Sequence, residues 1–189
     1  GLHRRRQPVG MPRDQRQPRA CILDRGDVRS LVVRKARIGF LMAGGQRDPS
    51  LQPEQRAAAG SPVRVALIGA GRFGTSVAAQ TSQIPGMRLV AVADPNEANG
   101  AGALEAAGWS PDQWERTDSS HTAASITSAG RAALVPDFEA LDAIQIDVVV
   151  ESTGHPTIGA RSALQAIRLG RHVVMVTVEA DVTCGWALA

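Results

Sequence analysis

The sequence predicts an α/β fold in which a doubly wound parallel sheet is covered by helices on both faces. Three observations carry this prediction. The apolar run 63–68 ends in Gly-x-Gly-x-x-Gly, the pattern of a strand that turns tightly into a helix. Further short apolar runs alternate along the chain with helix-compatible segments. The connections are short, which together with this alternation favours a parallel sheet with right-handed crossovers.

Helix and turn signals place the elements of the first half. Proline at position 53 and glycine at position 60 fit the two ends of a short helix. Apolar, β-branched runs predict two strands, and a Pro-Gly turn precedes the second. Asn96 fits a helix start and Gly108 a helix end. The predicted elements are a helix over 53–59, a strand over 63–68, a helix over 72–82, a strand over 88–93 and a helix over 96–107.

The second half repeats the alternation after a polar loop over 109–120. The run 146–151 has an apolar centre that suits a buried parallel position, and apolar residues at helical spacing precede Gly170. The predicted elements are helices over 122–132, 136–143 and 158–169 and strands over 133–135, 146–151 and 172–178. The expected sheet order is 3-2-1-4-5, without the sixth strand of the full doubly wound fold.

The glycine-rich turn indicates a binding site for a dinucleotide. Gly69 permits the tight turn, Gly71 leaves room for a pyrophosphate, and Gly74 lets the helix lie close to the strand. The N-terminus of the helix then directs free N–H groups toward the phosphates. We therefore expect the whole turn to contact the cofactor, through Gly69, Ala70, Gly71, Arg72, Phe73 and Gly74. The alternative is a glycine-rich turn in another kind of α/β protein.

Asp94 bears on the choice of cofactor. It follows the second strand, 20 residues beyond Gly74, where a carboxylate can accept hydrogen bonds from the adenosine ribose. A carboxylate there repels a 2′-phosphate, so Asp94 favours NAD. Arg72 can pair with the pyrophosphate or with a 2′-phosphate, which keeps NADP open. The alternative is that Asp94 caps the following helix.

Two further loops are expected at the same end of the sheet, since ligands of such folds bind outside the carboxyl ends of the strands. Ser152, Thr153 and Gly154 follow the fourth strand, and Gly154 allows the backbone to approach the nicotinamide ribose. Ser152 or Thr153 can bond the ribose or the carboxamide, unless the triplet only caps the next helix. Glu179 follows the fifth strand and is the last expected cofactor contact, with a solvated loop acid as the alternative.

Composition excludes several classes of protein. The chain has 189 residues and 43% hydrophobic residues, as in globular proteins. No apolar run approaches the ~20 residues that span a membrane. The two cysteines, Cys21 and Cys184, lie far apart, which argues against a disulfide framework and a zinc site. We expect a cytoplasmic protein without membrane or metal.

The chain divides into a basic extension over 1–51 and a dinucleotide-binding domain over 52–189. Residues 1–60 hold 13 of the 21 Lys and Arg but only 5 of the 18 Asp and Glu. The basic extension also contains several prolines and shows no hydrophobic periodicity, so it is expected to be mostly disordered. Its Arg4-Arg5-Arg6 run can bind nucleic acid, but the aromatic residues that stack bases are missing. We therefore do not expect nucleic acid as a partner.

The segments 64–74 and 89–96 resemble the cofactor domain of homoserine-dehydrogenase-like and Gfo/Idh/MocA-type oxidoreductases. The segments 148–154 and 170–181 are most similar to the homoserine-dehydrogenase-like subgroup that carries a SAF-type domain and includes deoxyxylulose-phosphate-reductoisomerase-like enzymes. The resemblance covers about residues 52–183. One departure is that homoserine dehydrogenases carry Asn-Lys after the fifth strand, where this chain has Thr177-Val178-Glu179.

The resemblance implies a Rossmann-type NAD(P)-binding domain of an oxidoreductase. The reaction would be hydride transfer between nicotinamide and a small carbonyl or hydroxyl substrate. Family members continue into a substrate domain with the catalytic residues, so the chain is expected to be a truncated cofactor domain whose catalytic residues cannot be assigned. Alternatives are a Gfo/Idh/MocA-type sugar dehydrogenase and a non-catalytic dinucleotide-binding module or inactive fragment. An exposed strand edge would favour pairing into a homo-oligomer.

Overall fold

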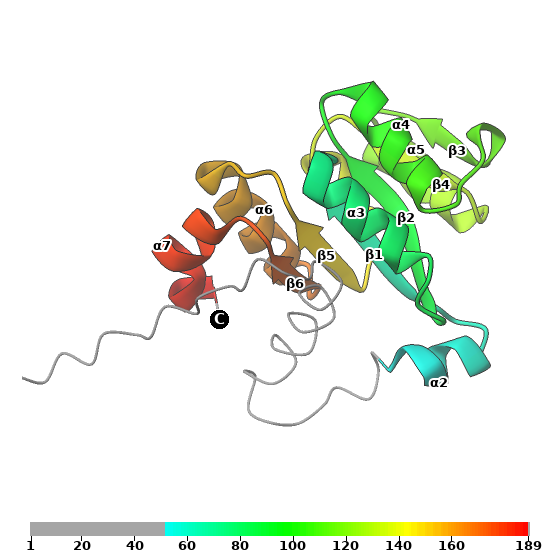
Figure 1. The fold of residues 1–189 in the computed structure, drawn as a ribbon, viewed down its shortest axis with the longest axis horizontal. Helices are drawn as coiled ribbons and strands as arrows, with labels where there is room; N and C mark the ends of the chain where they lie inside the picture. The colour runs from blue at the N-terminus through cyan, green and yellow to red at the C-terminus, as the bar shows by residue number, and fades with distance from the viewer. Residues whose placement is uncertain (1–51, 189) are drawn as a thin grey trace, which may run out of the picture.

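The computed structural model describes residues 52–188 and contains one parallel sheet flanked by helices (Figure 1). The strand order is β3-β4-β2-β1-β5-β6. The strands are β1 (Val63–Ile68), β2 (Met87–Ala93), β3 (Trp114–Arg116), β4 (Ala132–Val135), β5 (Val148–Glu151) and β6 (His172–Met175). The expectation for the basic extension over 1–51 lies outside the described residues.

The helices mostly match the expected segments. The α-helices are α2 (Pro53–Ala58), α3 (Arg72–Thr81), α4 (Glu97–Ala106), α5 (Ser120–Ser128), α6 (Pro156–Arg168) and α7 (Val178–Leu188), and two single 3-10 turns are η2 (Pro111–Gln113) and η3 (Glu139–Leu141). Asn96 caps α4 by accepting from the N–H groups of Ala98 and Asn99. The helix predicted over 136–143 is reduced to η3, a difference of length and type.

Each face of the sheet is buried, as the continuous apolar runs require. Val65 and Leu67 of β1 join a cluster with Val77 of α3 and Leu104 of α4. Ala66 and Ile68 join a second cluster with Ile126 of α5 and with residues of α6. Successive side chains of a strand point to opposite faces, so β1 contributes to both clusters and forms the centre of the core.

Two parts of the predicted fold were wrong at the ends of the sheet. The order 3-2-1-4-5 is present as β4-β2-β1-β5-β6, but β3 adds a sixth strand within the expected polar loop and pairs in parallel with β4. Its three residues are too few for a periodic pattern. The strand predicted over 172–178 stops at Met175, and α7 begins at Val178. The β-branched residues 176–178 resemble a strand, but the chain continues as a helix beside α6 (Figure 1).

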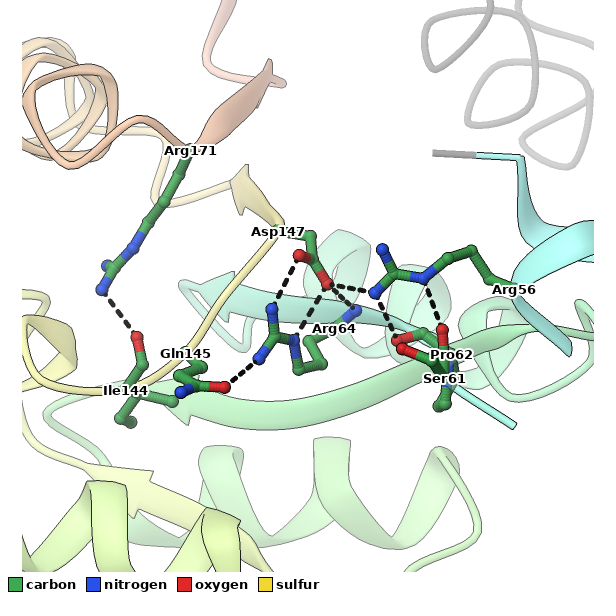
Figure 2. A network of polar contacts seen from close by, with 8 residues as sticks. All are labelled: Arg56, Ser61, Pro62, Arg64, Ile144, Gln145, Asp147 and Arg171. Atoms are coloured by element: carbon green, nitrogen blue, oxygen red, sulfur yellow. Dashed lines mark hydrogen bonds and ion pairs between the residues drawn. The ribbon is translucent and has the colours of Figure 1, made fainter. Parts of the chain in front are cut away.

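An ion-pair network fixes the amino ends of the central strands (Figure 2). Asp147, just before β5, accepts from the backbone N and Nε of Arg64 at 2.8 and 3.0 Å. Arg64 Nη2 lies 2.8 Å from the other carboxylate oxygen, and Arg56 of α2 lies 3.3 Å from Asp147. Burial alone would raise the pKa of Asp147, but these hydrogen bonds and charges together hold it below its ordinary value.

Arg171, just before β6, forms a second hydrogen-bond network at the same end of the sheet. Its Nη2 donates to the carbonyl oxygens of Leu141, Asp142 and Ile144 at 2.8–2.9 Å, the last of which appears in Figure 2. Burial lowers the pKa of this guanidinium, and the charge of Asp142 opposes that effect. Both networks lie where strands begin, so the loops at the carboxyl ends are left to form a site.

Candidate functional site

The turn between β1 and α3 is built around two glycines that no other residue can replace without a shift. Gly69 has φ +86°, and a Cβ there would lie 2.8 Å from the N and Cα of Thr153. A Cβ on Gly74 would lie 2.0 Å from the carbonyl oxygen of Gly69. These glycines therefore let α3 and the loop after β5 pack directly against the turn.

Gly71 differs from the other two glycines because a Cβ there would meet nothing within 4 Å. It is the N-cap residue of α3, and no side chain caps this helix end. Arg72, the first helical residue, is exposed, while Phe73 packs against the core. The turn thus leaves open space in front of an uncapped helix N-terminus, the arrangement that suits an anionic phosphate.

Asp94 joins the end of β2 to the turn. Its Oδ2 accepts from the backbone N of Ala70 at 2.7 Å, and its Oδ1 accepts from the N of Asn96 at 2.8 Å. The residue is 9% exposed. The alternative role as a helix cap is wrong, because Asn96 is the N-cap of α4. An ionised carboxylate keeps further lone pairs after two such bonds, so Asp94 can still accept from a ribose hydroxyl.

Ser152 joins the end of β5 to the same turn. Its Oγ lies 2.7 Å from the carbonyl oxygen of Gly69 and 3.1 Å from that of Ile68. The single hydroxyl hydrogen is therefore used inside the protein. The alternative of a helix cap is wrong for Ser152, because the N-cap of α6 is His155 and no side chain caps it. The structure places Ser152 beside the turn, and a direct cofactor contact stays a prediction.

Thr153 and Gly154 follow in the same loop. Gly154 has φ +70°, is exposed, and a Cβ on it would meet nothing within 4 Å. Its N–H donates to Thr177 Oγ1 at 3.0 Å. Thr153 Oγ1 donates to Glu151 at 2.6 Å and accepts from the N of His155 at 3.2 Å. Gly154 is thus exposed in this loop, as is His155 after it, whereas Thr153 Oγ1 is bonded within the protein.

Glu151 is a polar residue of the site that the sequence did not single out. It is the last residue of β5 and is 0% exposed. Its Oε1 accepts from Thr153 N at 2.8 Å, Thr153 Oγ1 at 2.6 Å and Thr177 Oγ1 at 2.9 Å. An acid at the end of an otherwise apolar strand is the only signal that could have found it.

Glu179 lies in the first turn of α7 and not in an extended loop. It is exposed, and Asp181 in the same turn is exposed too. Acids in a first turn favour the helix through its dipole, which gives both a structural reason. Among residues 52–188, no hydrogen bond or ion pair joins Glu179 to the glycine turn, so its cofactor role stays a prediction.

Residues 52–188 contain neither a metal-type cluster nor a helix suited to span a membrane. No cluster of three or more His, Cys, Asp or Glu residues there is arranged to hold a metal ion. None of the helices formed by these residues combines the length and the apolar character needed to cross a membrane.

Comparisons with known proteins found similarity among solved structures only. No protein-family model matches the chain, and no curated protein matches it. GenD2 from gentamicin A biosynthesis, in complex with NAD, is 23% identical with a TM-score of 0.44, over 60% of this chain and 26% of that one. A putative myo-inositol dehydrogenase from Sinorhizobium meliloti 1021 is 25% identical with a TM-score of 0.44, over 67% and 32%.

The WlbA dehydrogenase from Bordetella pertussis, in complex with NADH and UDP-GlcNAcA, is 20% identical with a TM-score of 0.44, over 66% of this chain and 35% of that one. The aligned part of this chain thus corresponds to between 26% and 35% of the length of these three proteins. The sheet order and the glycine turn define a Rossmann-type α/β fold for residues 52–188.

Proposed function

We propose that residues 52–188 form the NAD(P)-binding domain of an oxidoreductase. One observation carries the proposal: Asp94 and Ser152, which follow different strands, both bond the backbone of the Gly69–Gly74 turn. Three segments that are distant in sequence therefore meet at the carboxyl end of the sheet. This is where ligands bind in open α/β sheets.

The chain's residues fit a dinucleotide in an extended arrangement. The open space at Gly71 and the uncapped start of α3 suit the pyrophosphate, with Arg72 exposed beside it. Asp94 suits the adenosine ribose, and Gly154 suits the nicotinamide ribose. A bound nicotinamide would supply the hydride chemistry, and the protein's part is to bind and orient it. The carboxylate of Asp94 favours NAD over NADP.

The finer assignment concerns the whole protein. We place a Gfo/Idh/MocA-type dehydrogenase before a homoserine-dehydrogenase-like one, because Thr177-Val178-Glu179 stands where homoserine dehydrogenases carry Asn-Lys. Thr177 here is 3% exposed and bonds Glu151, so it does not offer a free polar group in place of that pair. The proposed reaction is hydride transfer to or from a small carbonyl or hydroxyl substrate, and turnover would distinguish it from a non-catalytic module.

The test is a calorimetric titration of the chain with NADH and, separately, with NADPH. Gly71→Ala is the diagnostic variant, because its Cβ enters open space and leaves the fold undisturbed. Gly102→Ala is the matched control, since a Cβ on this α4 glycine also meets nothing within 4 Å. We expect binding that Gly71→Ala weakens by roughly tenfold or more and that Gly102→Ala leaves unchanged. A folded chain that binds neither dinucleotide would refute the proposal.

A further inference from the structure

A carboxylate without a cationic partner lies beneath the loops at the nicotinamide side of the proposed site. Glu151 is 0% exposed. The salt bridges described within residues 52–188 join arginines to Asp147, Glu97, Glu115 and Glu139, and none includes Glu151. Burying a carboxylate is costly unless hydrogen bonds compensate it. The buried carboxylate of Glu151 therefore needs hydrogen-bond donors around it.

Those donors come from two loops. Oε1 accepts from the N and the Oγ1 of Thr153, which follows β5, at 2.8 and 2.6 Å. It also accepts from the Oγ1 of Thr177, which follows β6, at 2.9 Å. The other oxygen, Oε2, lies 3.4 Å from the N of Thr177. Glu151 thus fixes the ends of two neighbouring strands to one another.

The two threonine hydroxyls pass this constraint to the backbone of the loop. Thr177 Oγ1 accepts from the N of Gly154 at 3.0 Å, and Thr153 Oγ1 accepts from the N of His155 at 3.2 Å. The N–H groups of three consecutive residues, 153 to 155, are therefore held by Glu151 directly or through one hydroxyl. A hydroxyl that accepts from an N–H can give its hydrogen to the carboxylate, so the whole network is consistent with Glu151 as an acceptor.

We propose that Glu151 is the positioning residue for the nicotinamide half of the dinucleotide. This inference rests on the proposed function, since it presumes a dinucleotide in the site. Glu151 acts through Thr153, Thr177 and the backbone of Gly154. The adenosine half is held by a different set of groups, the glycine turn and Asp94. The loss of Glu151 should therefore weaken the binding of the nicotinamide half and leave the binding of the adenosine half unchanged.

The experiment compares NADH with ADP-ribose, which has the adenosine and the pyrophosphate but no nicotinamide. Both are titrated calorimetrically into the full chain and into Glu151→Gln, which keeps the size but removes the charge and one acceptor. We expect the affinity for NADH to fall about tenfold and that for ADP-ribose to change by less than about twofold. Glu105→Gln, an exposed acid on α4, is the control and should change neither.

If the Glu151→Gln chain does not fold, a second pair of variants tests the same role. Thr177→Val removes the hydroxyl that links Gly154 to Glu151, and Thr177→Ser restores it. We expect the selective loss of NADH affinity in the valine variant and its recovery in the serine variant. Equal losses for both ligands, or no loss for either, would overturn the role of Glu151. A wild-type chain that binds ADP-ribose and NADH keeps the proposed function whatever these variants do, and one that binds neither overturns both.

Discussion

Ser152 Oγ lies 2.7 Å from the carbonyl oxygen of Gly69 and so ties the loop after β5 to the glycine turn. The two residues are 83 positions apart in the sequence. A Cβ on Gly74 would lie 2.9 Å from the same Oγ, so the hydroxyl also borders the start of α3. The loop after β5, the glycine turn and the start of α3 therefore meet at this one hydroxyl.

Removing that hydroxyl should loosen the turn without unfolding the chain. We expect Ser152→Ala to lower the free energy of unfolding by about 1 kcal/mol and to weaken NADH binding. Urea denaturation and calorimetry measure the two effects. Ser125→Ala is the control, because that hydroxyl bonds the carbonyl of His121 within α5. Unchanged stability and affinity in Ser152→Ala would show that the contact is not needed.

Gly74→Ala tests the close packing of α3 on the turn. The added Cβ would lie 2.0 Å from the carbonyl oxygen of Gly69, so backbone has to move. We expect a loss of roughly 2–4 kcal/mol of stability. Gly102→Ala adds the same atom to a helix where there is room, and should stabilise by up to ~1 kcal/mol. Thermal or urea unfolding of both variants checks this, and equal stabilities would contradict it.

Asp94→Asn tests the end of β2. The amide group has one acceptor oxygen, so either Ala70 N–H or Asn96 N–H loses its partner. We expect about tenfold weaker NADH binding and a smaller preference for NADH over NADPH, because the negative charge is gone. Competitive titration with both dinucleotides measures this preference. Asp112→Asn, an exposed acid in η2, should leave it unchanged, and an equal effect there would refute a specific role for Asp94.

Asp147 should make the stability of the fold sensitive to acid. Its pKa is lower in the folded chain than in an unfolded one, so its stabilisation is present above a pH of ~4 and is lost as the pH falls through the folded-state pKa. We expect Asp147→Asn to be less stable than wild type at neutral pH by roughly 1–3 kcal/mol. The difference should shrink in acid. Urea denaturation across the pH range checks this, and a constant difference would contradict it.

The local parts of the fold could be predicted from the sequence. The turn from β1 into α3 is specified by consecutive residues, and the order of the five longer strands follows from their alternation with helices. β3 could not be predicted, because three residues with two exposed side chains become a strand only by pairing with β4. The start of α7 was missed because β-branched residues precede it and favour a strand.

In the candidate site, too, features set by neighbouring residues could be predicted, and features set by contacts between distant segments could not. Gly69, Gly74 and Asp94 stand in a spacing that has a known physical reason, so the sequence could single them out. The structure adds what spacing cannot give. The hydroxyl of Ser152 is used to brace the turn, and the carboxylate of Glu151 is surrounded by donors from two loops. The first fact depends on β5 lying beside β1, and the second depends on β5 lying beside β6. A local sequence pattern contains neither neighbour.

The place of β1 between β2 and β5 has a consequence for a chain that is synthesised from its N-terminus. β2 emerges soon after β1, but Asp147 follows Arg64 by 83 residues. At ~5–20 residues per second this is a delay of roughly 4–17 s. During that time Ser152 has not been synthesised, so the glycine turn lacks the hydroxyl that bonds Gly69. The edge of β1 that will pair with β5 is also open, and another chain can pair with it. The proposed site is completed only after Ser152 and the loop that follows β6 have left the ribosome.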